Sequence, residues 1–377
     1  MVASPNNPFR PIIFDLFAGV GGLSLGAARA GFEVRAVVEL DPIAIKTHAL
    51  NFPAAIHIAR DISSLSGAEL LRTGGVNADE LDGLIGGPPC QGFSVMGHQR
   101  RDDARNQLFF DFFRLVMETR PKFFIAENVP GILAPSSRDF VETALSMVSN
   151  TYSLFEPIII RAADLGAATT RTRVFIVGID DGRMNANLSG SDIKAISSSP
   201  IYVGHALSGL PSIRSSWAHE AQGWRRVFDL PSDSFFERVT NSVPIGVGDA
   251  SAIERLHRNG EVSGCIGTKH TELTISRFAK VRPGESDPVS RSPRLNKLGF
   301  CPTIRAGTAA DRGSFQAVRP IHPGSPRVIT PREAARLQGF PDWFQFHATK
   351  WHSFRQIGNS VSPIVAECVL SALHAKL

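Results

Sequence analysis

Short apolar runs recur along roughly the first half of the chain, and polar or helical segments separate them. Such runs, when turn residues bound them, are typical of buried strands. Between two of the runs, Phe109, Phe112, Phe113 and Val116 follow helical spacing, so these side chains are expected in the core. The alternation predicts an α/β fold with a doubly wound, mostly parallel sheet. The expected strands lie at residues 11–17, 34–40, 56–58, 84–85, 123–125, 158–160 and 174–177.

The pattern changes at Gly182, where Ser, Gly, Pro and Arg become frequent and the strand–helix alternation ends. We place a domain boundary there. Further on, Thr330-Pro331-Arg332-Glu333 has the form of a capping box with proline at the first helical position, which predicts a helix through Leu337. An apolar helix after Val361 is expected to close the chain.

The net charge of +5 over 377 residues is modest, but it is unevenly distributed. Residues 182–330 contain 19 Lys and Arg against 12 Asp and Glu, whereas the remainder contains 21 against 23. A basic segment beside a slightly acidic remainder favours a polyanion-binding module joined to a catalytic one. A solvated surface can show the same bias, so charge alone does not identify nucleic acid as the partner.

Composition disfavours several other classes of protein. Residues 1–10 lack the apolar segment of a secretory signal, and no apolar run approaches the length of a membrane span. Cys90, Cys265, Cys301 and Cys368 lie far apart without a Cys-x-x-Cys pair, which argues against a zinc site and a disulfide framework. We therefore expect a cytoplasmic protein with no bound metal.

Candidate catalytic side chains lie at the ends of three of the predicted strands: two follow a strand and one pair precedes a strand. Cys90 lies in the loop GGPPCQGFS, where paired prolines fix φ and remove backbone donors, so a stiff loop presents the thiol at a strand end. Most free cysteines are inert core residues, but the turn residues around Cys90 favour a reactive role. Glu127 ends the next strand on the same rim. Arg171 and Arg173 enter a later strand, and their spacing directs both toward one side, which favours an anionic or carbonyl partner.

A second set of candidates surrounds a glycine-rich turn. The sequence Gly19-x-Gly21-x-x-Ser24 joins a strand to a helix, and its glycines allow a ligand to approach the backbone closely. The third glycine of a dinucleotide fingerprint is missing. Glu39 ends the next strand and Asp61 follows the one after, both at positions suited to nucleoside hydroxyls and amines. Together the three strand ends predict an adenosine pocket.

Six ordered motifs make the chain similar to the cytosine-C5 DNA methyltransferases. They cover the chain from residue 11 to the C-terminus except the variable region near 182–300, and their order and rough spacing match. The motifs are DLFAGVGG from Asp15, GPPCQGFS from Gly87, ENV from Glu127, RTR from Arg171, REAARLQGFP from Arg332 and QIGNSV from Gln356.

The resemblance implies a Rossmann-like methyltransferase sheet and two domains. Residues 1–181 with 346–377 would form the catalytic domain, and residues 182–345 a smaller target-recognition domain across a DNA cleft. By the same resemblance Cys90 adds to carbon 6 of cytosine, and Glu127 holds and protonates the ring at N3 and holds its exocyclic amine, which stabilises charge as the thiol adds. Arg171 with Arg173 would steady the site and the O2 carbonyl. The target base would be flipped out of the duplex, with residues 91–105 as a closing loop.

The implied cofactor is S-adenosyl-L-methionine. The family pattern differs here at Thr169, where many members have glutamine, and at Leu40, where some have an aromatic residue. The resemblance assigns Phe17 to stacking on the adenine, and Gly19, Gly21 and Gly22 to the turn on the methionine side. Glu39 would hold the ribose hydroxyls, Asp61 with Ile62 the adenine edge, and Pro88, Leu108 and Asn359 would complete the pocket.

The expected partner is double-stranded DNA, bound by a monomer, and the sequence leaves open whether a cognate restriction endonuclease accompanies it. A tRNA cytosine-C5 methyltransferase would share Cys90 and Glu127, but the long basic segment suits duplex DNA better. A catalytically silent DNA-binding regulatory protein would need neither residue. A nicotinamide oxidoreductase is disfavoured because the glycine pattern departs from its fingerprint.

Overall fold

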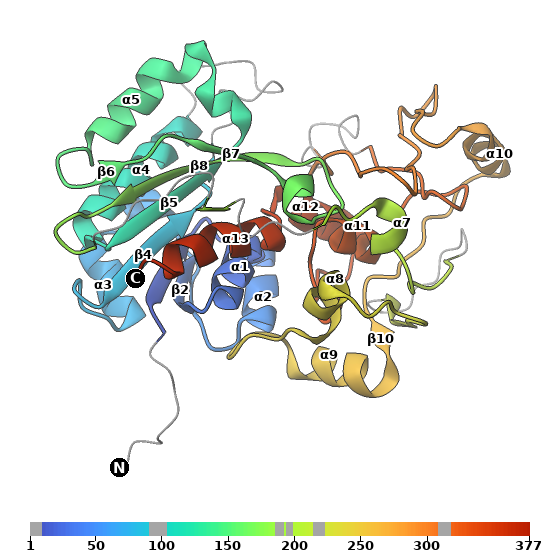
Figure 1. Cartoon of the computed structure of the whole chain (residues 1–377), viewed down its shortest axis with the longest axis horizontal. Coiled ribbons are helices and arrows are strands. Elements are labelled where there is room, and N and C mark those ends of the chain that lie inside the picture. Colours follow the sequence, from blue (N-terminus) through green and yellow to red (C-terminus); the bar gives the residue numbers. More distant parts are fainter. Residues whose placement is uncertain (1–9, 90–103, 185–191, 194–198, 214–222, 308–317) are drawn as a thin grey trace.

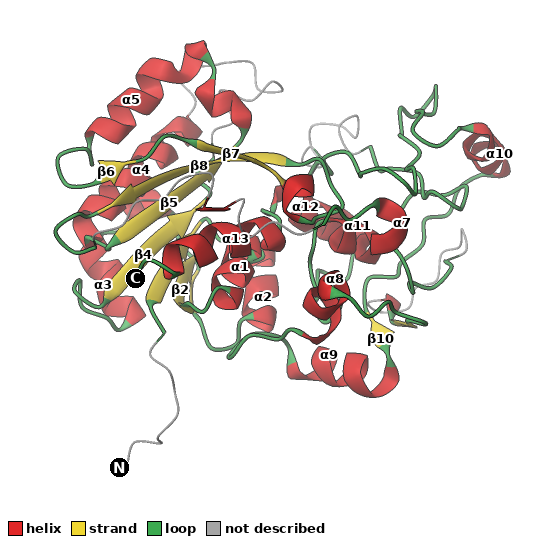
Figure 2. Cartoon of the chain, in the orientation of Figure 1, coloured by secondary structure: helices red, strands yellow, loops and turns green. Residues whose placement is uncertain are grey.

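The computed structural model describes residues 10–89, 104–184, 192–193, 199–213, 223–307 and 318–377. Figure 1 shows a strand-rich part on one side and a part built from short helices and long loops on the other. Figure 2 makes the contrast plain, because nearly all the strands lie in the first part. The predicted α/β class is confirmed.

One eight-stranded sheet has the strand order β3-β2-β1-β4-β5-β8-β6, and β7 also pairs with β8. The five strands from β3 to β5 run parallel, whereas β8 is antiparallel to β5, β6 and β7. The order reverses between β1 and β4, and open parallel sheets bind ligands beyond the carboxyl ends of the strands at such a reversal. The strands are β1 (Ile12–Leu16), β2 (Glu33–Val38), β3 (Ile56–Ile58), β4 (Leu81–Gly86), β5 (Phe123–Asn128), β6 (Ser153–Leu154), β7 (Ile158–Arg161) and β8 (Thr172–Ile179).

Helices cover both faces of this sheet. Neighbouring residues of one strand point to opposite faces, so Ile13 joins one hydrophobic cluster and Phe14 the other. On the Ile13 side pack α1 (Gly22–Arg29), α2 (Pro42–Asn51) and α13 (Pro363–His374). On the Phe14 side pack α3 (Gly67–Gly74), α4 (Ala104–Thr119) and α5 (Arg138–Ser146). The predicted core residues of α4 are fully buried at Phe109, Phe112, Phe113 and Val116.

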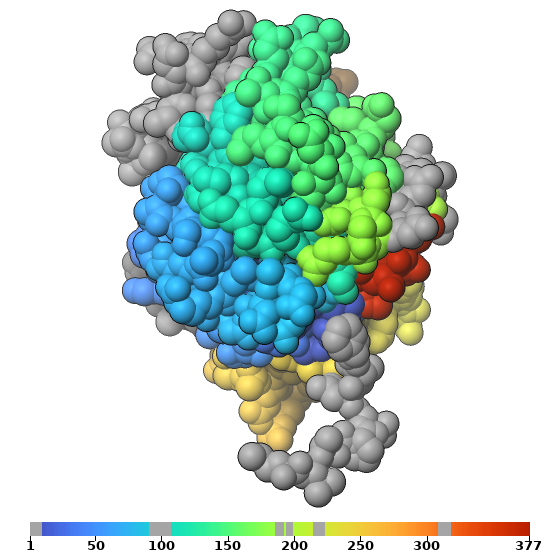
Figure 3. Space-filling view, turned by 90° about the vertical axis from the view of Figure 1, so that its left-hand side faces the viewer, coloured from blue at the N-terminus to red at the C-terminus, as the bar shows by residue number. Residues whose placement is uncertain are grey.

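The C-terminal helix α13 returns to the first part and lies against α1 (Figure 1). The two helices pack closely at Gly26, where an added Cβ would lie 2.2 Å from the Cβ of Ala366 and 2.5 Å from the backbone nitrogen of Glu367. In Figure 3 the visible face is formed mainly by the first half of the chain, and the C-terminal segment reaches it only along one edge. Close packing at Gly26 therefore fixes where the last helix lies.

The second part contains little regular structure. The capping box that the sequence predicts is confirmed, since Glu333 N donates to Thr330 Oγ1 and Thr330 N to the Glu333 carboxylate. The proposed division at residues 182 and 346 stays a prediction. The elements are α7 (Val203–Ala206), β9 (Arg225–Arg226), α8 (Ser234–Phe236), α9 (Ala250–Glu254), β10 (Glu261–Val262), α10 (Glu272–Lys280), α11 (Pro331–Leu337) and α12 (Lys350–Asn359).

Buried side chains of α11 and the turn after it tie the loops of the second part to one another and to the turn that joins α12 to α13. Arg332 is almost fully buried and donates to the carbonyls of Ser263, Pro341 and Phe344. Gln338 Nε2 donates to Ile357 O at 2.8 Å and to Ser360 O at 2.7 Å. Because a buried donor is costly to leave without an acceptor, these bonds hold the turn at 357–360 firmly in place.

Candidate active site

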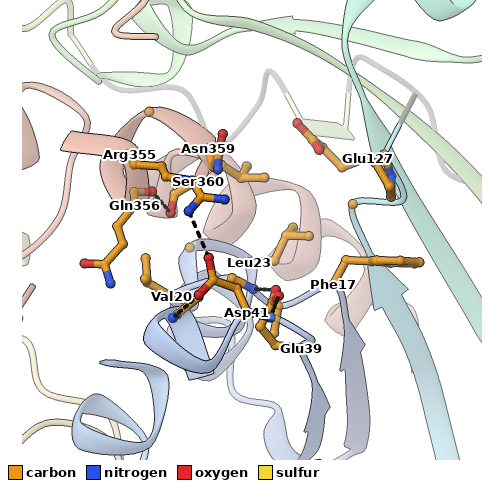
Figure 4. Close-up of a pocket in the computed structure, with 18 of the residues that line it drawn as sticks. Phe17, Val20, Leu23, Glu39, Asp41, Glu127, Arg355, Gln356, Asn359 and Ser360 are labelled. Atoms are coloured by element: carbon orange, nitrogen blue, oxygen red, sulfur yellow. Dashed lines mark hydrogen bonds and ion pairs between the residues drawn. The ribbon is translucent and has the colours of Figure 1, made fainter. Parts of the chain in front are cut away.

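A cavity of about 410 Å³ lies beyond the carboxyl ends of β1, β4 and β5, at the reversal of strand order. Its volume is within the usual range for small-molecule sites, about 300–1,000 Å³. Segments that are distant in sequence form its walls: the turn after β1 with the segment that follows β2, the ends of β4 and β5 with the start of β8, and the end of α12 with the turn that joins it to α13 (Figure 4). The lining residues used below are Phe17, Gly19, Gly22, Glu39, Asp41, Pro88, Pro89, Glu127, Arg171, Arg173, Arg355, Gln356, Asn359, Ser360 and Val361.

The glycine turn and Glu39 form the first wall. Phe17 has φ of 59° and Gly19 has φ of 58°, and a Cβ at Gly19 would meet nothing within 4 Å, so the backbone there faces open space. Gly19 N donates to Glu39 Oε2 at 2.8 Å, and Asp41 N donates to Glu39 Oε1 at 2.7 Å. Burial raises the pKa of Glu39, and these two backbone donors oppose the rise. Each carboxylate oxygen keeps a lone pair that can accept a hydrogen bond from a ligand hydroxyl group.

Glu127 and Arg173 form the second wall. Glu127 lies on β5 next to the end of the strand, and Arg173 on β8 places its Nε 2.6 Å from Glu127 Oε1. The pair is largely buried. Despite this short contact, Oε1 finds no well-aligned hydrogen-bond donor among the described residues. Within the described part of the chain, Glu127 Oε1 thus has an ion-pair partner but no aligned donor, so it can accept a further hydrogen bond.

Arg171 links this wall to the C-terminal turn. Its buried guanidinium donates to Gly358 O at 2.9 Å and to Asn359 O at 3.4 Å. Burial lowers the pKa of Arg171 well below its usual value, and the nearby charge of Arg173 adds to this effect. Both arginines line the cavity, which agrees with the prediction that they point to one side. Arg171 thus positions the backbone of the third wall.

The segment leading to Cys90 is part of the cavity wall. Pro88 and Pro89 line the cavity, and Asn128 Nδ2 donates to Pro88 O at 3.1 Å, which ties this segment to the end of β5. Cys90 itself lies outside the described residues, as does most of the predicted closing loop at 91–105. The residue before Cys90 therefore belongs to the same cavity as Glu127.

The other cysteines are unsuited to nucleophilic chemistry. Cys265, Cys301 and Cys368 are buried free thiols. Burial raises the pKa of Cys265 and Cys301 to about 12 and that of Cys368 to about 11. Because the thiolate is the reactive form, these three would remain thiols at neutral pH.

Most of the predicted cofactor residues meet in this cavity, but four do not line it. Gly21 faces away, since its Cβ would collide with the ring of Phe52. Asp61 is exposed and accepts hydrogen bonds from Ser63 N and Oγ, which lower its pKa, while Ile62 is buried. Leu108 is half-buried on α4. Sequence reasoning missed Asp41 and Arg355 as lining residues, and Asp41 carried only the signal of a helix start.

No group of three or more His, Cys, Asp or Glu side chains in the described ranges could hold a metal ion. Within those same ranges no helix has both the length and the apolar character that crossing a bilayer requires.

The whole chain matches known proteins. The model of the C-5 cytosine-specific DNA methylase family matches residues 12–375. The chain belongs to this family. It is 40% identical over 364 residues to the Type II methyltransferase M.XorII of Xanthomonas oryzae pv. oryzae, an alignment that covers 96% of this chain and 84% of the relative. It is 33% identical to the Type II methyltransferase M.DdeI of Desulfomicrobium norvegicum, covering 95% of this chain and 87% of the relative.

Solved structures of methyltransferases share this architecture. A crystal structure described as a prophage-encoded DNA modification methyltransferase of E. coli superposes with a TM-score of 0.87 at 47% identity, covering 97% of this chain and 99% of that one. The Dnmt2 methyltransferase of S. pombe superposes with a TM-score of 0.61 at 16% identity, covering 97% and 98%, which supports the fold alone. This C-5 cytosine methylase is thus a DNA cytosine methyltransferase, as the sequence predicts.

Proposed function

We propose that the protein transfers a methyl group from S-adenosyl-L-methionine to carbon 5 of a flipped cytosine within one short sequence of duplex DNA. One observation carries the proposal beyond family membership. The glycine turn with Glu39 and the Glu127–Arg173 pair open into a single cavity at the switch point of the sheet. A nucleoside-binding wall and a base-binding wall therefore face one space.

The residues present fit the cofactor. The open backbone at Gly19 allows close approach of a ligand, and the carboxylate of Glu39 keeps lone pairs for ribose hydroxyls. Phe17 offers an aromatic surface, and Asn359 with Pro88 belongs to the same lining. When bound, S-adenosyl-L-methionine supplies the electrophilic methyl group.

The protein side chains act on the cytosine ring. We assign Cys90 as the nucleophile, whose thiolate sulfur bonds to carbon 6 and thereby makes carbon 5 nucleophilic. Carbon 5 then bonds to the methyl carbon as the bond from that carbon to the sulfonium sulfur breaks, which leaves S-adenosylhomocysteine. Loss of the carbon 5 proton to a base then breaks the sulfur–carbon 6 bond and returns the thiolate. Glu127 accepts from the exocyclic amine with the Oε1 lone pair that lacks an aligned donor, and Arg173 holds that carboxylate in position.

Duplex DNA suits the charge distribution of the chain. Residues 182–330 contain seven more basic than acidic side chains, and phosphate neutralisation contributes much of the affinity of DNA-binding proteins. We further propose that the protein acts in the cytoplasm as a monomer of 40.8 kDa, either alone or beside a separate restriction endonuclease.

Covalent trapping tests this assignment. A mixed-sequence duplex in which 5-fluorocytosine replaces cytosine lacks the proton that must leave carbon 5, so the adduct cannot resolve. With S-adenosyl-L-methionine present, the wild type should give a denaturant-stable protein–DNA band, and Cys90→Ser should give none while still binding DNA in a filter assay. A stable band from Cys90→Ser would remove Cys90 from the proposed role.

A further inference from the structure

Two opposite charges from the two ends of the chain face each other at the cavity. Arg355 of α12 places its NH1 3.3 Å from Oδ2 of Asp41, the residue that precedes α2. Both residues line the cavity, and their side chains are 39% and 31% exposed. Figure 4 shows Arg355 directed from α12 toward Asp41, with Gln356 and Ser360 beside it. The family motifs do not include either residue.

Asp41 is fixed in place by its backbone and by one of its two carboxylate oxygens. Oδ1 accepts from Ile43 N at 2.9 Å and from Ala44 N at 3.3 Å, which caps α2. The backbone nitrogen of Asp41 donates to Glu39 Oε1. These bonds hold Oδ2 toward Arg355 and the cavity, so a negative charge is preorganised there beside Glu39.

Arg355 is held much less firmly than the other arginines of the lining. Arg171 donates to two backbone carbonyls, and Arg173 contacts the buried Glu127. Among the residues that the structure describes, Arg355 has only the partly exposed ion pair with Asp41, and its guanidinium carbon lies 5.6 Å from the centre of the Trp351 ring. Exposed ion pairs contribute about 0–1 kcal/mol, so exchanging this one for a ligand costs little.

We propose that Asp41 and Arg355 bind the amino-acid end of the cofactor, with Arg355 taking the α-carboxylate and Asp41 Oδ2 the α-ammonium group. The inference rests on the proposed use of S-adenosyl-L-methionine. An α-amino acid carries opposite charges on adjacent groups, and the pair presents the complementary charges side by side. Glu39, assigned to the ribose, is hydrogen-bonded to Asp41, so nucleoside and amino-acid sites adjoin. Binding replaces one exposed ion pair by two charge-assisted hydrogen bonds.

Calorimetry with the purified full-length protein and two ligands tests the assignment. S-Adenosylhomocysteine carries the amino-acid group, whereas 5′-methylthioadenosine has the nucleoside and sulfur without it. Arg355→Met keeps the aliphatic stem, and Asp41→Asn keeps an oxygen to cap α2. Each substitution should weaken S-adenosylhomocysteine binding about 10- to 100-fold. Binding of 5′-methylthioadenosine should change less than about twofold, and Arg355→Lys should recover part of the affinity.

Each outcome separates this inference from the proposed function. A wild type that binds neither ligand would refute the proposed cofactor. If the wild type and Arg355→Met bind S-adenosylhomocysteine equally well, only the role of Arg355 is refuted. If that variant also binds DNA more weakly, Arg355 contacts a DNA phosphate instead. Equal losses for both ligands would also overturn the inference. Arg258→Met, which removes an exposed ion pair with Glu254 on another helix, is the matched control.

Discussion

A chain of polar side chains beneath the glycine turn predicts an unusual pH dependence of stability. Ser24 Oγ donates to Asp15 Oδ2 at 2.5 Å and lies 3.0 Å from His48 Nε2, and His48 Nδ1 lies 2.9 Å from His57 Nε2. Ser24 thus connects Asp15 to His48, and His48 connects in turn to His57. Asp15, Ser24 and His48 are fully buried.

Asp15 and His48 make the free energy of unfolding depend on pH with opposite signs. Burial raises the pKa of Asp15 to about 7, although the hydrogen bond from Ser24 opposes the rise. The contribution of this carboxyl to the stability of the folded protein is therefore lost as pH rises from about 4 to 7. Burial lowers the pKa of His48 well below 6.5, so the imidazole loses stability as pH falls below 6.5. Each slope is at most about 1.4 kcal/mol per pH unit, and the two oppose each other in the pH range just below 6.5.

Single substitutions should reveal the two slopes. Between pH 4.5 and 6.0 the free energy of unfolding of Asp15→Asn, relative to wild type, should rise by about 2 kcal/mol. That of His48→Gln should fall over the same pH range. Urea unfolding followed by circular dichroism at constant ionic strength measures both, and any pH-independent cost of substitution cancels in the difference. Variants that track the wild type within about 0.5 kcal/mol would refute the reasoning.

Two other predictions concern packing and catalysis. Gly26→Ala should lower the free energy of unfolding, measured in urea, by about 1–3 kcal/mol, because the new Cβ would overlap Ala366 and its backbone. At Gly324 a Cβ has room, so Gly324→Ala should change that free energy by less than about 1 kcal/mol. Equal effects at the two glycines would contradict the close packing of α1 and α13. Glu127→Gln should slow methyl transfer about 10²- to 10⁴-fold with S-adenosylhomocysteine affinity unchanged by calorimetry, and lost affinity would mean that Glu127 is misassigned.

Local sequence signals predict the sheet and much of the cavity well. The strands of the first part carry their own apolar pattern, and motifs at strand ends must meet on one rim of a parallel sheet. Phe17, Glu39 and Glu127 therefore meet where the sequence places them. The buried Phe112 and the capping box at Thr330 are likewise determined by spacing alone.

Contacts between distant segments could not be predicted in this way. The pairing of Arg355 with Asp41 depends on how α13 packs against α1 and on how Gln338 holds the turn before it. The burial of Asp15 with His48 likewise appears only once β1 and α2 are packed together. The place of Asp61 after a strand predicts a cofactor contact, which stays a prediction, and the pattern does not show that this carboxylate caps a 3-10 turn at Ser63.

Methylation of duplex DNA beside tRNA tests most directly whether the protein methylates cytosine in one short sequence of duplex DNA. Purified protein would be incubated with tritiated S-adenosyl-L-methionine and either mixed-sequence duplex DNA or bulk tRNA, and the DNA would then be sequenced after bisulfite treatment. The account predicts tritium in duplex DNA, with protected cytosines confined to one short sequence motif. Tritium in tRNA alone, or in neither nucleic acid despite intact duplex binding, would contradict it.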